Sequence, residues 1–264
     1  SNQPVLLNDP QTIWVVKSGQ LVLHGVSIDG RELVGNRRFL FNIGAGEAMF
    51  GVTLAPTAKP NERRGILAVA IEETELQQIH LAELVEKVKA GDANAIGLIE
   101  GWLGHLGKWL SAQPSIAPAP TNSVVAAGTH YLSLLKEQTL IPPRPSLNNE
   151  QLNQTVAWVD VRQGVTHWQG IPDLPVDRDT PPMPLMFGTW LTAANAVEVY
   201  ATPTPELESI DLIPASFSQL HAYFWHCFNL LEQQQIESEF RRFQERQQLN
   251  RQTIESSMCE LAGI

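Results

Sequence analysis

The chain has 264 residues and a mass of 29.2 kDa, which suits one large domain or two small ones at about 100–200 residues per domain. With 43% hydrophobic and 17% charged residues, it lacks the low hydrophobicity and high charge that accompany intrinsic disorder. Its formal net charge of −10 argues against nonspecific binding to nucleic acid or anionic lipid, because both surfaces repel an acidic protein.

Two cysteines, Cys227 and Cys259, cannot build a disulfide framework, so we expect a reducing, cytoplasmic compartment. No run approaches the ~18 consecutive apolar residues of a membrane-spanning helix, and the start has no signal-peptide pattern. Because the chain begins with Ser-Asn rather than Met, we expect it to be a piece of a longer protein.

Residues 12–80 have the pattern of short β-strands separated by glycine turns. Two apolar runs, 13–16 and 21–23, flank Gly19 and predict a hairpin. The Ile-Asp-Gly sequence at 28–30 predicts a second turn.

Two further strands are predicted in this region. Residues 37–43 form one candidate, which ends at the Gly-Ala-Gly-Glu sequence of 44–47. The apolar run 66–71 predicts a buried strand. Short strands at this spacing indicate a small sandwich or barrel.

From residue 79 the apolar period changes to that of a helix. Gly91 and Asp92 separate two predicted helices, and Trp102 and Trp109 lie one heptad apart on one face of the second. The apolar residues at helical spacing are Ile79, Leu81, Leu84, Val85, Val88, Ile96, Ile99, Leu103, Leu106 and Leu110.

A second β region spans about 124–213, with strand patterns at 156–161 and 197–200. Prolines gather within it, and because proline lacks a backbone donor we expect them in loops rather than in central strands. The largest group is Pro172, Pro175, Pro181, Pro182 and Pro184, followed by Pro203 and Pro205. From Ser216, a predicted N-cap, to Leu261 the sequence predicts a long helix whose apolar face at 217–231 packs on the second β region.

The two β regions match in order, which indicates an internal repeat. Chance similarity of generic strand-glycine-strand sequences is the alternative. The matched pairs are 14–19 with 158–164, 50–54 with 187–191, and 68–76 with 197–207.

The repeat predicts a mainly β protein with two tandem β-jelly-rolls, each with C-terminal helices. The expected division is a first roll plus helices (1–112), a Pro/Ala linker (113–123), a second, degenerate roll (124–215) and a long helix (216–264).

Three motifs in order, 14–19, 46–51 and 64–70, resemble the cyclic nucleotide-binding domain family, a β-jelly-roll of the cupin type flanked by helices. The resemblance implies a weak ligand site at Phe50, Gly51 and Val52, with Arg64 or Arg63 on the phosphate. Val52 departs from the family's ribose-binding glutamate, a loss of about 1.5–3 kcal/mol of charge-assisted hydrogen bonding. In the second copy that position is Thr189 and no arginine follows before Val197, so we expect no cyclic nucleotide there.

The whole chain resembles the N-terminal soluble region of an NHLM-type bacteriocin-export ABC transporter permease/ATPase. The matching segments are 13–19, 37–51, the Phe-Gly-Thr-Trp-Leu of 187–191, and a polar helix 232–255 that ends in 257–262. This resemblance implies a cut just before a membrane segment, a position on the cytoplasmic side of the bacterial inner membrane, and ATP with Mg²⁺ in a missing ATPase domain. It also implies as partners the rest of the transporter and a leader peptide, whereas nucleic acid is excluded. The apolar residues of 232–262 are thinly spaced, so this part of the helix is expected to dock on a neighbour, to form a homodimer as a coiled coil, or to serve as a solvent-bridging linker.

Catalytic and metal-binding patterns are missing from the sequence. There is no His-x-His metal motif, no Gly-x-Ser-x-Gly elbow and no phosphate loop, and the cysteines fit small apolar helix residues better than a peptidase nucleophile. We therefore expect no enzyme, no metal and no cofactor in this chain. The first hypothesis is a regulatory or interaction module of a peptide exporter. The second is a sensor of a cyclic nucleotide or another small anion in the first roll, and the third is a cupin-like enzyme.

Overall fold

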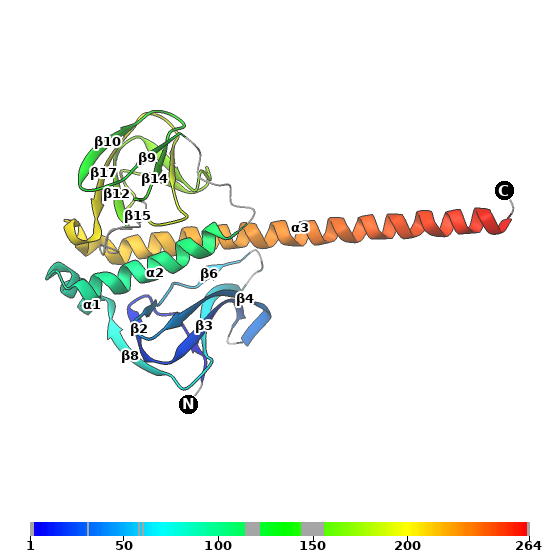
Figure 1. Cartoon of the computed structure of the whole chain (residues 1–264), viewed down its shortest axis with the longest axis horizontal. Helices are drawn as coiled ribbons and strands as arrows, with labels where there is room; N and C mark the ends of the chain where they lie inside the picture. Colours follow the sequence, from blue (N-terminus) through cyan, green and yellow to red (C-terminus); the bar gives the residue numbers. More distant parts are fainter. Residues whose placement is uncertain are drawn as a thin grey trace, which may run out of the picture. The chain divides into compact units, whose positions relative to one another are not determined.

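The computed structural model describes residues 3–30, 32–57, 59, 61–113, 122–143 and 156–262, without the side chains of 251 and 255–262. Most of the predicted linker 113–123 lies outside these residues. Contacts within the chain define two compact units, Ser1–Trp225 and His226–Ile264. The first unit holds two β-rolls with helices, which is the predicted fold class (Figure 1).

The first roll consists of two antiparallel sheets. One has the order β1-β7-β3-β4, with β6 added on β7, and the other has the order β5-β2-β8. The strands are β1 (Val5–Leu6), β2 (Thr12–Ser18), β3 (Gln20–Asp29), β4 (Glu32–Gly44), β5 (Ala48–Phe50), β6 (Ala55–Pro56), β7 (Glu62–Ala70) and β8 (Glu75–His80).

The hairpin predicted around Gly19 is wrong, because β2 and β3 belong to different sheets. A bulge between Val16 and Ser18 and the left-handed backbone of Gly19 (φ 85°) carry the chain from one sheet to the other. The turn predicted at 28–30 is confirmed, since β3 pairs with β4 across Gly30. The strand predicted at 37–43 is confirmed as the second half of β4.

Helices α1 (Leu81–Lys89) and α2 (Ala93–Ser111) confirm the periodicity of residues 79–110. The Oδ1 atom of Asp92 caps α2 by accepting hydrogen bonds from the backbone nitrogens of Asn94 and Ala95 at 2.8 and 3.2 Å. Trp102 and Trp109, which were predicted to lie on the same face of the second helix, are both buried.

The second roll also has two sheets, with the orders β10-β17-β12-β15 and β14-β13-β16-β11-β9. Its strands are β9 (Ser123–Val125), β10 (His130–Leu134), β11 (Thr139–Ile141), β12 (Ala157–Gln163), β13 (Val165–Trp168), β14 (Pro175–Asp177), β15 (Met183–Leu185), β16 (Leu191–Ala193) and β17 (Val197–Pro203).

Three prolines that we expected in loops lie in strands instead. Pro175 and Pro184 belong to β14 and β15, which are edge strands, so their missing N–H groups break no ladder between two neighbours. Pro203 ends β17.

Strand pairing confirms the repeat but corrects its alignment. β12 corresponds to β2, because both carry a bulge before a left-handed glycine, Gly164 in one copy and Gly19 in the other. The second match is three residues off: the bulges make Trp158 the counterpart of Ile13, and Ile13 pairs with Phe50 whereas Trp158 pairs with Pro184. The third is also wrong: β17 pairs with β12 as β8 pairs with β2, so 197–200 corresponds to β8 and not to 68–71.

The 3-10 turns η1 (Thr204–Glu206) and η2 (Ile210–Leu212) lead from β17 into the long helix α3 (Ile213–Ala262). Ser216 is therefore a buried residue of the first turns rather than the predicted N-cap, because the helix begins three residues earlier. None of the helices in the described part of the chain is long and apolar enough to cross a membrane.

The start of α3 contacts both rolls, and not only the second roll as predicted. The Phe217 ring lies 5.0 Å from that of Phe50 and 6.4 Å from that of Trp158, measured between centroids. In the view of Figure 1, α2 and these first turns of α3 lie between the two rolls. The hydrophobic core of the first unit is therefore continuous through its helices.

α2 also approaches the backbone of the second roll closely at Gly107. A Cβ at this position would overlap the carbonyl oxygen of Phe187, and one at Gly188 would overlap the carbonyl oxygen of Gly107. Only glycine at both positions lets the helix and the turn meet.

This contact gives a first prediction. Gly107→Ala should lower the free energy of unfolding by about 1–3 kcal/mol, because a methyl group must push α2 and the 186–188 turn apart. Urea unfolding followed by circular dichroism measures the change.

Gly104→Ala is the matched control on the same helix, where a Cβ meets no atom within 4 Å. It should raise stability by about 0.4–1 kcal/mol through the unfolded state and helix propensity. Equal effects of the two substitutions would contradict the close approach.

Candidate functional site

Two residues predicted at the ligand site of the first roll, Gly51 and Val52, form hydrogen bonds with the N-terminal segment of that roll. The amide of Gly51 donates to the carbonyl oxygen of Thr12 at 2.9 Å, and that of Val52 donates to Leu7 at 3.1 Å. A Cβ on Gly51 would overlap the carbonyl oxygen of Asp9. Two of the amides in the predicted cassette are thus bonded to the chain itself.

Phe50, the remaining residue of that predicted cassette, is buried at the end of β5. Its ring lies 5.8 Å from that of Trp102 and packs on α3 through Phe217. Phe50 therefore contributes to the core between the first roll and the helices.

The predicted phosphate residues, Arg63 and Arg64, lie on β7 opposite β6, so the structure brings them close to the 50–56 segment. Arg63 is exposed. Arg64 is half-buried and its Nη1 donates to the Oγ of Ser27, its cross-strand neighbour on β3.

The carboxylate of Glu62 lies in the same network. Burial raises its pKa, but the hydrogen bond from Ser27 and the charges of Lys59 and Arg64 outweigh burial and hold the pKa below its usual value. Lys59 lies 3.3 Å from Glu62 Oε2. Arg64, which was predicted to bind the phosphate of a ligand, thus already interacts with the carboxylate of Glu62.

Apolar side chains fill the roll beside Arg64. Val26, Ile28 and Leu67 form a buried cluster, joined by Leu6, Leu54 and Val69. A Cβ at Gly65 would lie 2.8 Å from Leu54 and 3.2 Å from Ile28. The interior next to the predicted anion site is therefore an apolar core.

The second roll shows a local role for Thr189. Its hydroxyl accepts a hydrogen bond from the amide of Met186 at 3.0 Å and donates to the carbonyl oxygen of the same residue at 2.8 Å. Both bonds close the turn that faces Gly107.

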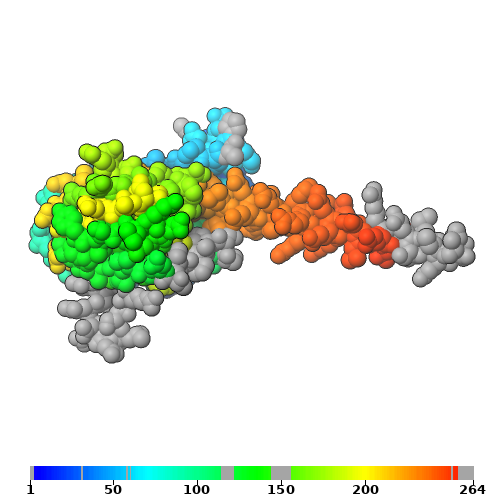
Figure 2. Space-filling model, turned by 90° about the horizontal axis from the view of Figure 1, so that it is seen from above, coloured from blue at the N-terminus to red at the C-terminus, as the bar shows by residue number. Residues whose placement is uncertain are grey.

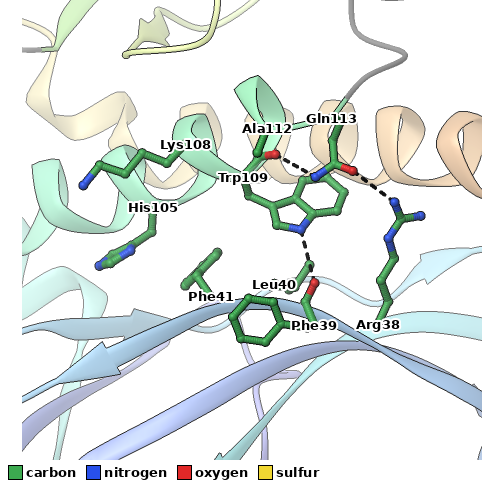
Figure 3. Close-up of a pocket in the computed structure, with 9 residues that line it drawn as sticks. All are labelled: Arg38, Phe39, Leu40, Phe41, His105, Lys108, Trp109, Ala112 and Gln113. Carbon is green, nitrogen blue, oxygen red and sulfur yellow. Dashed lines mark hydrogen bonds between the residues drawn. The ribbon is translucent and has the colours of Figure 1, made fainter.

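A groove of about 350 Å³ lies between β4 and α2, and the sequence did not predict it (Figure 3). Leu40, Phe41 and Trp109 are buried, whereas the Phe39 side chain is 56% exposed. Arg38, His105 and Lys108 add cationic or ionisable groups to a chain of net charge −10. The lining residues are Arg38, Phe39, Leu40, Phe41, His105, Lys108, Trp109, Ala112 and Gln113.

Hydrogen bonds hold one end of the groove in place. Arg38 Nη2 donates to Gln113 Oε1 at 3.0 Å, and Gln113 Nε2 donates to the carbonyl oxygen of Trp109 at 2.8 Å. The Trp109 Nε1 donates to the carbonyl oxygen of Phe39 at 3.3 Å, which ties α2 to β4. The Arg38 guanidinium lies 5.4 Å from the centre of the Trp109 ring, a cation–π distance.

The other end of the groove is built on His105. Its Nε2 donates to Glu47 Oε1 at 2.7 Å, and its ring stacks on Phe41 with 5.0 Å between centroids. The second oxygen of Glu47 accepts the amide of Gly44 at 2.7 Å. Lys108, which is exposed, lies three residues further along α2.

The sequence offered only partial signals for this groove. Arg37 and Arg38 are an adjacent basic pair, a pattern that ordinary surface solvation also produces, and Trp109 was assigned to a helix face. Gln113 lies 75 residues from Arg38, so no local pattern links them.

Two buried ionisable groups lie on α2 and α3. Trp102 Nε1 donates to His221 Nε2 at 3.0 Å, and burial lowers the pKa of His221 to about 3, so its imidazole is neutral. Burial raises the pKa of Glu100 to about 7 against a hydrogen bond from Thr204. Among the described residues, Glu100 Oε1 has no hydrogen-bond partner.

The remaining histidines, cysteines and acids provide no second site in what the structure describes. No group of three or more His, Cys, Asp or Glu side chains could hold a metal ion there. Cys227 is buried and burial raises its thiol pKa to about 12, as suits a small apolar helix residue. Cys259 lies beyond the described side chains.

No protein-family model matches the chain, and no curated protein matches it. Among solved structures, the chain is similar to cAMP-bound PfPKA-R, with 11% identity over 88% of this chain and 79% of that one and a TM-score of 0.25. It is also similar to regulatory subunits of cAMP-independent protein kinase A from two trypanosomes. The guanosine-bound Trypanosoma cruzi protein has 8% identity, coverage of 81% and 72%, and a TM-score of 0.20. The Trypanosoma brucei protein has 10% identity, coverage of 81% and 73%, and a TM-score of 0.21.

A second prediction concerns Glu100. Its folded pKa of about 7 lies above the usual value of 4.5 for a glutamate, so the folded state binds more protons than the unfolded state between these values and is destabilised as pH rises. Relative to wild type, Glu100→Gln should gain about 1–3 kcal/mol between pH 4.5 and pH 7.5. His221, which destabilises the folded state as pH falls below 6.5, is present in both proteins and cancels.

Chemical denaturation at a series of pH values measures this difference. Glu198→Gln on the exposed face of β17 is the control and should follow the wild-type profile. If the difference in unfolding free energy between wild type and Glu100→Gln stays constant across the series, the pKa of Glu100 is not raised by folding.

Proposed function

We propose that this chain is a non-catalytic regulatory or interaction module that works by binding at the β4–α2 groove. The observation that carries the proposal is a groove with Arg38 at one end, Lys108 at the other, and the exposed Phe39 and the Trp109 ring between them, built from two elements distant in sequence (Figure 3). Such a surface offers cations beside apolar area, the combination that recognises a partner rather than one that performs chemistry.

The occupant best matched to this groove is an acidic peptide segment with an aromatic or aliphatic residue. Carboxylates would meet the guanidinium of Arg38 and the ammonium of Lys108, and an apolar side chain would cover Phe39. Because Gln113 and Trp109 already hold Arg38, little side-chain entropy is lost when a carboxylate binds to it.

A third prediction tests this groove with a labelled acidic peptide, Glu-Glu-Phe-Glu-Leu. Arg38→Gln should weaken its binding about tenfold through the loss of a charge-assisted hydrogen bond. Fluorescence anisotropy measures the affinity, and rising salt should weaken it further.

Arg37→Gln is the matched control, because Arg37 is the exposed neighbour on β4 and does not line the groove. It should keep the wild-type affinity, and Lys-Lys-Phe-Lys-Leu should not bind. An equal loss in both arginine variants would attribute binding to general charge and contradict the proposal.

The second candidate function is a sensor of a cyclic nucleotide or another small anion in the first roll. Arg63 and Arg64 favour it, since they lie beside the 50–56 segment. The bonds of Arg64 to Ser27 and of Gly51 and Val52 to the N-terminal segment favour the degenerate module instead.

A fourth prediction separates the two candidates by calorimetric titration with cAMP and cGMP. No binding heat is expected up to millimolar nucleotide. Micromolar binding that disappears in Arg64→Ala would contradict the degenerate module and support the sensor.

As the wider context we propose a peptide-exporting ABC transporter, supported by the resemblance of segments 13–19, 37–51 and 187–191 to that family. In this proposal the module lies on the cytoplasmic side of the bacterial inner membrane, joined to a transporter whose ATPase domain binds ATP and Mg²⁺. The peptide it recognises would be an acidic leader segment. Sequencing the gene beyond residue 264 tests this context, which requires membrane helices followed by a phosphate loop.

A further inference from the structure

The second unit carries large apolar side chains that the chain leaves open to solvent. Ile236, Phe240, Phe243 and Ile254 on α3 are each between 57% and 66% exposed. Figure 2 shows this part of α3 in space-filling form, from orange to red. Exposed apolar surface of this kind on one helix marks an interaction face.

These side chains follow the heptad pattern of a coiled coil. Phe240 and Ile254 take the a positions and Ile236 and Phe243 the d positions, with Gln247 and Asn250 as a polar stretch in the same seam. Leu249, which is 63% exposed, lies off the seam at a c position.

The charges beside the seam oppose a parallel pair of identical helices. A parallel pair sets each g position against the e position five residues further along the other copy. Glu232 would then face Glu237, and Arg246 would face Arg251, so like charges meet at both ends of the seam.

An antiparallel pair removes this conflict. In that orientation g positions face g positions, and centring the pair between Phe240 and Phe243 sets Glu239 against Arg246 of the second copy. Twofold symmetry forms the same opposite-charge pair twice. The described Glu239 and Arg246 side chains are both exposed on α3.

We propose that two copies of this chain associate in antiparallel fashion through residues 232–251 of α3. Phe240 of each copy packs on Phe243 of the other, and Ile236 packs beside Gln247. The occupant of the face is a second copy because the charge pattern is complementary to itself only in this orientation. The dimer is independent of ligand binding at the β4–α2 groove.

Sedimentation equilibrium of the full chain over about 5–200 µM tests the proposal. The mass should rise with concentration from 29.2 kDa toward twice that value. Phe240→Ser should raise the dimer dissociation constant at least tenfold, whereas Leu249→Ser, an equally exposed control off the seam, should leave it unchanged. Circular dichroism checks that both variants keep their helix content.

A charge exchange tests the orientation. Glu239→Arg should weaken the dimer severalfold by placing it against Arg246, and combining it with Arg246→Glu should restore the wild-type constant. A chain that stays monomeric at 200 µM, or a dimer that Phe240→Ser leaves intact, overturns the proposal. A dimer that needs Phe240 but ignores Glu239→Arg overturns the antiparallel arrangement.

Discussion

Helix α2 packs on three sides within the first unit, and the rest of the unit depends on that packing. Trp102 contacts Phe41 and Phe50 of the first roll and donates to His221 of α3. Gly107 meets the backbone of the second roll with no room for a methyl group. Because interiors are close-packed, a displacement of α2 would disturb its contacts with the first roll, the second roll and α3 together. The β4–α2 groove shares this dependence, since one of its walls is the outer side of the same helix.

In the first roll, the residues predicted to bind a ligand make their bonds within the chain. The amides of Gly51 and Val52 are bonded to the N-terminal segment, and Arg64 is bonded to Ser27 and close to Glu62. Leu6 and Leu54 join the apolar cluster beside them. Gly51, Val52 and Arg64, which a bound anion would need, thus already have partners inside the chain, and a buried polar group gives up such a partner only at a cost. The cationic and aromatic surface lies instead between β4 and α2.

Local patterns predicted many elements of the fold. Apolar spacing located α1 and α2, Gly91 and Asp92 marked the break between them, and Gly30 marked the β3–β4 turn. The sequence predicted less well which strands pair with each other. The hairpin around Gly19 and the alignment of 197–200 with 68–71 were wrong, because a strand's partner depends on contacts far away in sequence. The edge positions of Pro175 and Pro184 escaped prediction for the same reason.

By itself the sequence determined the helix periods and the turns, since each depends on neighbours within a few residues. It also indicated the repeat, through similar segments that recur in the same order. It also determined the acidic net charge of −10. Only the tertiary structure decided that the cationic Arg38 and Lys108 line one groove of this acidic chain. Arg38 and Gln113 are 75 residues apart, and Phe39 and Trp109 are 70 apart, so the groove exists only once α2 has packed on β4. The same packing decided the ionisation of Glu100 and His221, because burial between packed elements, and not the residue type, shifts their pKa values.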